Sequence, residues 1–316
     1  MSAIGIGVHR IAVVGCGVIG ASWAAHFLAR GFDVVATDPG GGAEDRLHGV
    51  VDAAWPALER IGLAAGASRE RLRFEDDLAR CVKDADFVQE NGPERLDVKR
   101  DLIARIDAAV GDHVLIATST SGILISALQD AARRPERVLV GHPFNPPHLV
   151  PLVEVVGGAL TSPEAVDRAM DFYAAIGKKP IRLQREMKGH IANRLQAALW
   201  REAFHLIEQG VATVADVDAA IAHGPGLRWA LLGPFLNLHL SGGSGGIGHA
   251  IDHLGPPIED WWRDLGHPTF SDSLRAKAVE GVADELDDRS LPAMVRQRDD
   301  VLLTLLALKA EADQLP

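Results

Sequence analysis

The stretch Ile11-Ala-Val-Val-Gly15-Cys-Gly17-Val-Ile-Gly20 decides the fold of the first half of the chain. Four apolar residues, typical of a buried strand, lead directly into three glycines with the spacing G-x-G-x-x-G, and a helical pattern follows. Gly15 permits the tight turn, Gly17 lets a phosphate approach the backbone, and Gly20 allows close packing of helix on sheet. The stretch therefore predicts a strand–turn–helix unit that binds the pyrophosphate of a dinucleotide.

The start of this helix and the next strand together indicate which dinucleotide binds. The backbone N–H groups of Val18, Ile19 and Gly20 lie at the predicted helix N-terminus, where free donors and the helix dipole attract phosphate. The second strand, Asp33–Thr37, is followed by Asp38, where a carboxylate accepts hydrogen bonds from the adenosine ribose. Because that carboxylate would repel the 2′-phosphate of NADP, we expect NAD. FAD shares the glycine pattern and is the alternative.

Short apolar runs alternate with longer helical patterns from about residue 10 to residue 181. The runs expected to be strands are Ile11–Val14, Asp33–Thr37, Asp86–Gln89, Val114–Thr118, Arg137–Gly141 and Leu152–Val156. Such alternation predicts crossover connections and a parallel sheet that is covered by helices on both faces. We therefore predict an α/β fold, a Rossmann-type doubly wound sheet, as an NAD-binding domain over residues 1–187.

The second half of the chain has no strand-like runs. Apolar residues recur at helical spacing in His190–Gly210, Val214–Ile221 and Met294–Leu308. A glycine-rich segment, Ser241–Gly248, is expected to be a loop at a helix boundary. We predict an all-helical C-terminal domain over residues 188–316. Its Trp- and Leu-rich helices need partners, so we expect it to form a homodimer and to contribute to substrate binding.

The composition excludes several classes of protein. The 316 residues carry 32 Lys and Arg against 43 Asp and Glu, and a formal net charge of −11 argues against a nucleic-acid or anionic-membrane partner. No run of about 18 apolar residues indicates a membrane helix, and Met1–Arg10 lacks the pattern of a signal peptide. Cys16 and Cys81 form neither a disulfide framework nor a zinc-binding spacing. We expect a cytoplasmic protein that acts on a small molecule.

A histidine and a glutamate flank a proline-rich turn. The segment Val138–Val156 reads as a strand that ends at His142, a turn, and a return strand that carries Glu154. Such a hairpin can bring the imidazole and the carboxylate into contact. The carboxylate then fixes the tautomer and raises the pKa of the histidine, as suits a general base near neutral pH. A histidine at a strand end is more often structural, so catalysis by His142 depends on its surroundings.

Further motifs follow in order along the chain: Gln89-Glu-Asn-Gly-Pro-Glu94, Ser119-Thr-Ser121, Gly141-His-Pro-Phe-Asn-Pro146, Leu152-Val-Glu-Val155 and Ala192-Asn-Arg-Leu195. Together with the glycine turn and Asp38, they resemble the 3-hydroxyacyl-CoA dehydrogenase superfamily over nearly the whole chain. The resemblance implies an enzyme that oxidises a 3-hydroxyl group with a His–Glu pair, and it favours NAD over FAD.

The same resemblance implies roles for single residues. His142 would take the hydroxyl proton, and Glu154 would orient His142 and stabilise its charge. Ser121 and Asn193 would hydrogen-bond the reacting oxygen of the substrate. Glu94 and Lys99 resemble the residues that lie at the nicotinamide ribose in this superfamily.

The C-terminal half differs from the members of the superfamily that act on CoA thioesters. Their Gly-rich ending followed by Phe-Tyr is absent, and Leu199–Phe204, Gly226–Pro234 and Arg298–Leu306 resemble another branch. That branch includes L-carnitine dehydrogenase, L-gulonate 3-dehydrogenase and lambda-crystallin, and its enzymes act on small free 3-hydroxy acids. We therefore expect oxidation of an L-carnitine- or L-gulonate-like acid. A 3-hydroxyacyl-CoA substrate and a crystallin-like NAD-binding protein without turnover are the alternatives.

Two features of the helical half bear on ligands. Arg228 is our candidate for the substrate carboxylate, because a guanidinium binds a carboxylate with two parallel hydrogen bonds. A salt bridge between helices or subunits is the alternative. His249 and His253 lie one helical turn apart, as in some zinc hydrolases, but no acid follows the first histidine and no third ligand is evident. We predict no metal site.

Overall fold

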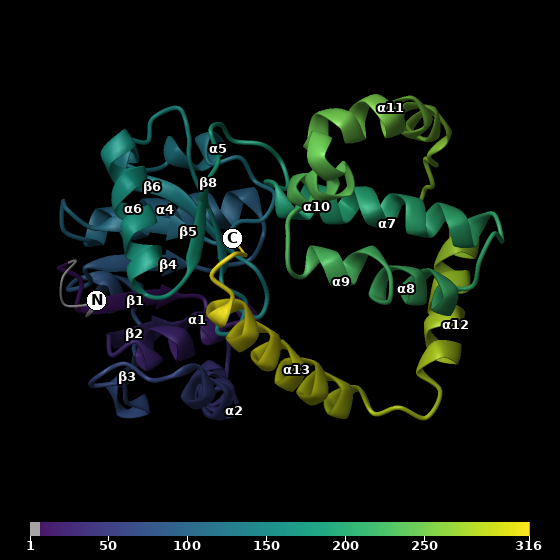
Figure 1. Cartoon of the computed structure of the whole chain (residues 1–316). Coiled ribbons are helices and arrows are strands. Elements are labelled where there is room, and N and C mark those ends of the chain that lie inside the picture. The colour runs from purple at the N-terminus through teal and green to yellow at the C-terminus, as the bar shows by residue number, and fades with distance from the viewer. Residues whose placement is uncertain (1–6, 316) are drawn as a thin grey trace. The chain divides into compact units, whose positions relative to one another are not determined.

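The computed structural model describes residues 7–315 of the chain (Figure 1). The chain divides into two compact units, Met1–Arg194 and Leu195–Pro316. The division falls in the first turn of helix α7 (Ala192–Glu208), close to the predicted boundary between residues 187 and 188. A division of cofactor and substrate binding between the two parts stays a prediction.

The first unit is built around one eight-stranded sheet with the strand order β3-β2-β1-β4-β5-β6-β7-β8. The first six strands run parallel, β7 is antiparallel to β6, and β8 is parallel to β7. The predicted doubly wound sheet is confirmed. The strands are β1 (Arg10–Val14), β2 (Asp33–Thr37), β3 (Leu72–Phe74), β4 (Phe87–Glu90), β5 (Leu115–Thr118), β6 (Val138–Pro143), β7 (Leu152–Gly157) and β8 (Lys179–Arg182).

Two short edge strands were not predicted from the sequence. In β3 an exposed arginine separates two apolar residues, and in β8 Ile181 stands between proline and arginine, so neither segment forms an apolar run. Both strands lie at the ends of the sheet order, where one side of a strand needs no partner. Their pairing with β2 and β7 is therefore a consequence of tertiary structure.

Helices cover both faces of this sheet (Figure 1). Alternate residues of β1 explain why: Ile11 and Val13 belong to one apolar cluster, whereas Ala12 and Val14 belong to the other. The first cluster contains Trp23 of α1, which stacks on Phe27 with ring centroids 5.1 Å apart. The helices of this unit are α1 (Val18–Ala29), α2 (Ala43–Ile61), α3 (Leu78–Val82), α4 (Leu96–Ala109), α5 (Ser126–Gln129) and α6 (Pro163–Ala175).

All regular secondary structure in the described residues of the second unit, 195–315, is helical, as predicted. It contains most of α7, followed by α8 (Val214–Ala222), α9 (Pro225–Trp229), α10 (Pro234–Ser241), α11 (Gly246–Asp264), α12 (Asp272–Leu286) and α13 (Leu291–Glu311). The glycine-rich segment lies at a helix boundary, as expected. It ends α10, forms a short 3-10 turn at Gly243–Gly245 and begins α11, where Gly246 has a φ of +60°.

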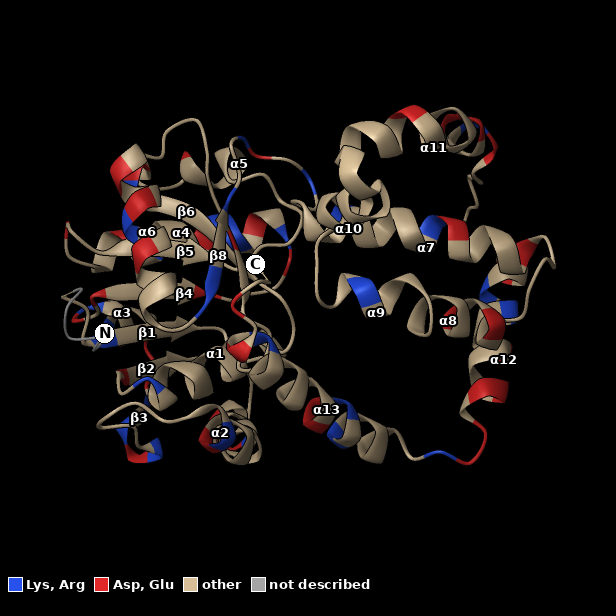
Figure 2. Cartoon of the chain, viewed as in Figure 1, with Lys and Arg blue, Asp and Glu red and all other residues tan. Residues whose placement is uncertain are grey.

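Charged residues of both signs are interspersed along the elements of each unit (Figure 2). Among the described residues, no helix is long and apolar enough to span a membrane.

Candidate active site

Each of the three positions in the first turn requires glycine for a different steric reason. Gly15 has a φ of +90°, and a Cβ there would lie 2.7 Å from the carbonyl oxygen of Asn91. A Cβ at Gly20 would lie 1.8 Å from the carbonyl oxygen of Gly15. At Gly17 a Cβ would meet nothing within 4 Å, so the backbone borders open space. This is the arrangement that a pyrophosphate needs in order to reach the backbone.

The N-terminus of α1 fits an anionic ligand. Gly17 is its N-cap and no side chain caps the helix, so the first-turn amides keep their donors for a ligand. Val18, in the first turn, is 70% exposed. The adjacent Cys16 thiol is no nucleophile, because burial, reinforced by the charge of Asp38, raises its pKa to about 12.

Asp38 lies directly after β2 and is fixed by the same turn. Its Oδ2 accepts a hydrogen bond from the Cys16 amide at 2.7 Å, and its Oδ1 accepts one from the Gly40 amide at 2.8 Å. These contacts hold the carboxylate beside the glycine turn, at the position that contacts an adenosine ribose in such folds. The residues present therefore fit a dinucleotide.

His142 and Glu154 face each other across the antiparallel pair of β6 and β7. His142 Nδ1 lies 2.9 Å from Glu154 Oε2, and the glutamate side chain is fully buried. The predicted contact is present, because the proline-rich turn returns the chain in the register that pairs these two residues. Since a carboxylate only accepts, Nδ1 carries the hydrogen and Nε2 keeps a lone pair.

The second oxygen of Glu154 accepts hydrogen bonds from the start of α7. The amides of Ile191 and Ala192 donate to Oε1 at 2.8 and 3.0 Å. Burial on its own raises the pKa of Glu154, but the hydrogen bonds from His142 and from these two amides outweigh it, so the pKa lies below its usual value. Glu154 is therefore a stable anion beside the imidazole.

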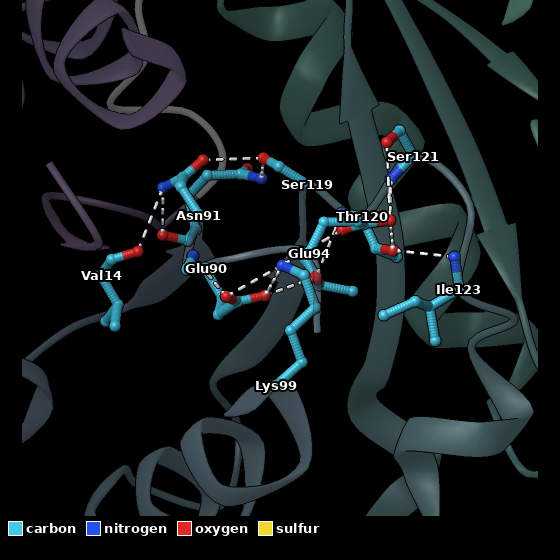
Figure 3. A network of polar contacts seen from close by, with 12 residues as sticks. Val14, Glu90, Asn91, Glu94, Lys99, Ser119, Thr120, Ser121 and Ile123 are labelled. Carbon is cyan, nitrogen blue, oxygen red and sulfur yellow. Dashed lines mark hydrogen bonds and ion pairs between the residues drawn. The ribbon is translucent and has the colours of Figure 1, made fainter. Parts of the chain in front are cut away.

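Glu94 organises the loop that carries Ser121 (Figure 3). Its Oε1 accepts from the Thr120 hydroxyl at 2.7 Å and from the amides of Ser121 and Gly122 at 3.0 and 2.9 Å. Burial opposes ionisation, yet these donors and the charge of Lys99 lower the pKa of Glu94. Sequence reasoning assigned Glu94 to the ribose and did not anticipate its contacts with this loop.

Lys99 is almost fully buried, at 1% exposure, and pairs with the equally buried Glu90 (Figure 3). Its Nζ lies 2.9 and 3.1 Å from the two carboxylate oxygens, which also accept from the Thr118 hydroxyl and the Gly92 amide. The same Nζ is 3.9 Å from Glu94. Lys99 thus links Glu90, at the end of β4, to Glu94, which holds the loop that carries Ser121. Its expected contact with the nicotinamide ribose stays a prediction.

A second polar network fixes the backbone beside His142. Gln89 Nε2 donates to the Ser119 hydroxyl at 2.9 Å and to the carbonyl of Gly141 at 3.2 Å. Tyr173 Oη donates to Gln89 Oε1 at 2.6 Å. Ser119 in turn donates to the side chain of Asn91 at 2.7 Å. Tyr173, the one tyrosine of the chain, was missed from the sequence because nothing local connects it with β4.

The predicted substrate residues lie in different places. Ser121 lies in the loop after β5, next to Thr120, whose carbonyl accepts from the ring of His190 at 3.0 Å. The His190 ring contacts that of His142, with centroids 5.0 Å apart. Asn193 lies in the first turn of α7, next to Ala192, which bonds Glu154. Arg228 is an exposed residue of α9 in the second unit.

The two histidines of α11 form no larger cluster. His249 and His253 stack with centroids 6.3 Å apart, and no group of three or more His, Cys, Asp or Glu in the described part of the chain could hold a metal ion.

Comparisons with known proteins agree with this geometry. Residues 10–187 match the family described as "3-hydroxyacyl-CoA dehydrogenase, NAD binding domain", and residues 189–267 match its C-terminal domain. The chain belongs to the 3-hydroxyacyl-CoA dehydrogenase family. As in that family, the cofactor is NAD, and the protein is an NAD-dependent oxidoreductase.

Two relatives within the 3-hydroxyacyl-CoA dehydrogenase family are similar over nearly their full lengths. L-carnitine dehydrogenase from Streptomyces griseus is 53% identical over 95% of this chain and 89% of the relative. L-carnitine dehydrogenase from Pseudomonas aeruginosa is 50% identical over 95% of this chain and 93% of the relative. These enzymes support NAD-dependent oxidation of a 3-hydroxy acid by this protein.

Solved structures agree with this family assignment. The NAD+-dependent 5-dehydrogenase of 5-formyl-3-hydroxy-2-methylpyridine 4-carboxylic acid is 28% identical, with a TM-score of 0.84 over 96% of this chain and 99% of that chain. (S)-3-hydroxybutyryl-CoA dehydrogenase from Ralstonia eutropha is 27% identical, with a TM-score of 0.62 over 68% of this chain and 76% of that chain.

Proposed function

We propose that this protein oxidises the 3-hydroxyl group of L-carnitine to a ketone with NAD as the acceptor. The observation that carries the proposal is the identity of about half of all residues with L-carnitine dehydrogenases, over 95% of the chain. L-Carnitine is a small free 3-hydroxy acid, the substrate class that the C-terminal half favours over CoA thioesters. L-Gulonate belongs to the same class and serves as a comparison substrate.

In this proposal His142 is the general base. Its Nδ1–H donates to Glu154, so the lone pair of Nε2 is available for the proton of the substrate hydroxyl. Glu154 then stabilises the imidazolium, because hydrogen bonds from the ring and from two amides keep the carboxylate ionised. NAD, when bound, accepts the hydride that leaves the same substrate carbon.

Two polar side chains are proposed to hold the reacting oxygen. Ser121 lies in the loop that Glu94 orders, and Asn193 follows the residue whose amide bonds Glu154. Donors held by such fixed contacts need little reorganisation when negative charge develops on the oxygen. Glu94, with Lys99 3.9 Å behind it, is proposed to face the nicotinamide ribose.

The two ends of L-carnitine need different partners. The carboxylate suits a guanidinium, and Arg228 is the proposed partner. The trimethylammonium group has no N–H donor and is recognised by the faces of aromatic rings. Trp200 of α7 and Trp229 of α9 are about half exposed and are the aromatic candidates.

The test is formation of NADH by the purified protein with L-carnitine, D-carnitine, L-gulonate and 3-hydroxybutyrate. We expect L-carnitine to give the highest kcat/KM. His142→Ala should lose about 10²- to 10⁴-fold in kcat, the usual contribution of a general base. Retained turnover in His142→Ala would refute the mechanism. NAD binding without turnover of any substrate in the panel would favour the crystallin-like alternative.

The family match also supports a second candidate, a 3-hydroxyacyl-CoA. The matching domains carry that description, and 3-hydroxybutyryl-CoA dehydrogenase has the same fold. Reduction of acetoacetyl-CoA with NADH separates the two candidates. A kcat/KM for acetoacetyl-CoA far above that for any free acid would replace the proposal.

A further inference from the structure

His190 occupies an unusual backbone position beside the proposed base. It ends the turn before α7, where its amide donates to the Met187 carbonyl at 3.0 Å, and its φ is +49°. A residue other than glycine in this left-handed region carries backbone strain, and such strain persists where the surrounding structure holds it, often at functional sites. The side chain is buried, with 3% of the residue exposed.

The hydrogen bond of the ring fixes its tautomer. His190 Nε2 lies 3.0 Å from the carbonyl oxygen of Thr120, which can only accept, so Nε2 carries the hydrogen. Nδ1 therefore carries a lone pair. It is buried and has no hydrogen-bond partner among the described residues. Buried polar atoms without a partner are few in folded proteins, and each needs an explanation.

The ring faces His142. The two centroids are 5.0 Å apart and the planes are tilted by 45°. Three titratable groups act on His190 from neighbouring elements: His142 of β6, Glu154 of β7 and Glu94 in the loop after β4. Burial, the largest influence, lowers the pKa of His190, so the ring adds no positive charge beside His142 around neutral pH.

We propose that His190 is a positioning residue that stabilises the protonated form of His142. Its Nδ1 accepts a hydrogen bond, directly or through one water molecule, from the proton that His142 Nε2 takes from the substrate hydroxyl. The substrate O–H bond breaks and the Nε2–H bond forms, while His190 stays neutral throughout. This inference rests on the proposed function, because it requires His142 to be the base.

The test compares the pH dependence of kcat/KM for His190→Phe, His190→Asn and the unsubstituted enzyme. Phenylalanine keeps the ring packing and removes the acceptor. Loss of the acceptor makes the imidazolium of His142 less stable, so the acidic limb should move to lower pH by about one pH unit, with kcat lowered about tenfold. His190→Asn places an amide oxygen near the position that His190 Nδ1 occupies in the unsubstituted enzyme. This variant should therefore return the acidic limb toward its original position. His113→Phe, at an exposed histidine, is the control and should change neither.

Each outcome decides a separate point. An unmoved limb in a folded His190→Phe variant that binds NAD normally would overturn the inference, and so would a limb that moves to higher pH, which would mean that His190 is charged. If His190→Phe does not fold, ¹⁵N NMR of the histidine rings decides, with His190 assigned by the spectrum of His190→Asn. A protonated His190 ring around neutral pH would contradict the proposal, and a neutral Nε2–H tautomer would support it. Turnover in His142→Ala would instead refute the proposed function itself.

Discussion

Tyr173 fills the space that a side chain at Gly141 would need. A Cβ atom at position 141 would lie 2.0 Å from Tyr173 Oη and 2.7 Å from Cζ. The tyrosine is fully buried and donates to Gln89, which in turn donates to the Gly141 carbonyl. Helix α6 and strand β4 therefore fix the backbone of β6 at the residue that precedes His142.

Gly141→Ala should destabilise the first unit and misplace His142. The added methyl group forces Tyr173 or β6 to move, and such overpacking costs about 1–3 kcal/mol of unfolding free energy. We expect kcat to fall more than the affinity for NAD, because the shift is centred on His142, the proposed base. Urea unfolding and NADH formation check both effects. Gly49→Ala, at an exposed site within α2 with no atom near its Cβ, is the control and should add up to about 1 kcal/mol. Equal stability of Gly141→Ala and the unsubstituted protein would contradict the steric argument.

Lys99→Met should be severely destabilising. The substitution leaves the Glu90 carboxylate fully buried without its cation, and breaking a buried pair in this way costs about 3–5 kcal/mol. The double variant Glu90→Gln/Lys99→Met should recover much of that loss, because no unpaired charge remains. Chemical denaturation measures both, with Lys83→Met at an exposed lysine as the control. A loss below about 1 kcal/mol in Lys99→Met would show that the pair contributes little.

The glycine turn was predictable because its causes are local. Asn91 leaves no room for a side chain at position 15, and the turn itself leaves none at position 20. The fixed G-x-G-x-x-G spacing reflects this geometry directly. The His142–Glu154 contact followed from a hairpin whose two strands are apparent in the sequence. Local rules therefore predicted the geometry of the glycine turn and the contact between His142 and Glu154.

The supporting contacts were not predictable, because they join distant segments. The helical pattern was expected to begin at His190, whereas α7 begins at Ala192 and His190 adopts a left-handed turn. Its bond to Thr120 spans 70 residues. The family resemblance assigned Lys99 to the nicotinamide ribose and did not indicate that α4 packs it against Glu90. Only tertiary structure reveals such contacts.

Asp38→Ser should relax the discrimination between NAD and NADP. The carboxylate accepts hydrogen bonds from the amides of Cys16 and Gly40, and its charge opposes a 2′-phosphate. Asp38→Ser would remove the hydrogen bonds that the hydroxyls of the adenosine ribose are expected to donate to the carboxylate. Losing hydrogen bonds to a charged group costs about 1.5–3 kcal/mol, so KM for NAD should rise about tenfold or more. KM for NADP should fall, because the opposing charge is gone. Initial rates with both cofactors test this, with Asp84→Ser at an exposed site as the control. An unchanged NADP/NAD ratio would argue against this role of Asp38.

Lys178 should make the protein more stable as pH rises above neutrality. Its Nζ is buried, donates to the carbonyls of Pro147 and Val150, and lies 5.1 Å from the ring centroid of Trp23. Burial, helped by the charge of Arg30, lowers its pKa to about 7, whereas the unfolded chain has a lysine pKa of about 10.4. Between these values the unfolded state binds more protons, so the free energy of unfolding increases with pH, by up to about 1.4 kcal/mol per pH unit.

Lys178→Met removes that titration and should flatten the increase. Urea unfolding at several pH values from neutral to mildly alkaline compares it with Lys179→Met, which changes the exposed neighbour and should keep the increase. The same slope in Lys178→Met and the unsubstituted protein would show that Lys178 does not deprotonate in the folded state over this range.

The second unit should associate with a second copy of the chain. Several of its large apolar side chains are mostly exposed, among them Phe235 at 75%, Trp262 at 66% and Phe270 at 80%. Large apolar side chains that stay exposed on a chain favour an interface, and a stable dimer buries about 800 Å² on each partner. Sedimentation velocity at micromolar concentration should give a dimer.

Phe235→Glu should shift the equilibrium toward monomer, because a carboxylate is costly to bury at an interface. Leu160→Glu, at a 52% exposed residue of the first unit, should leave the dimer intact. A monomer of the unsubstituted protein at that concentration would contradict the prediction.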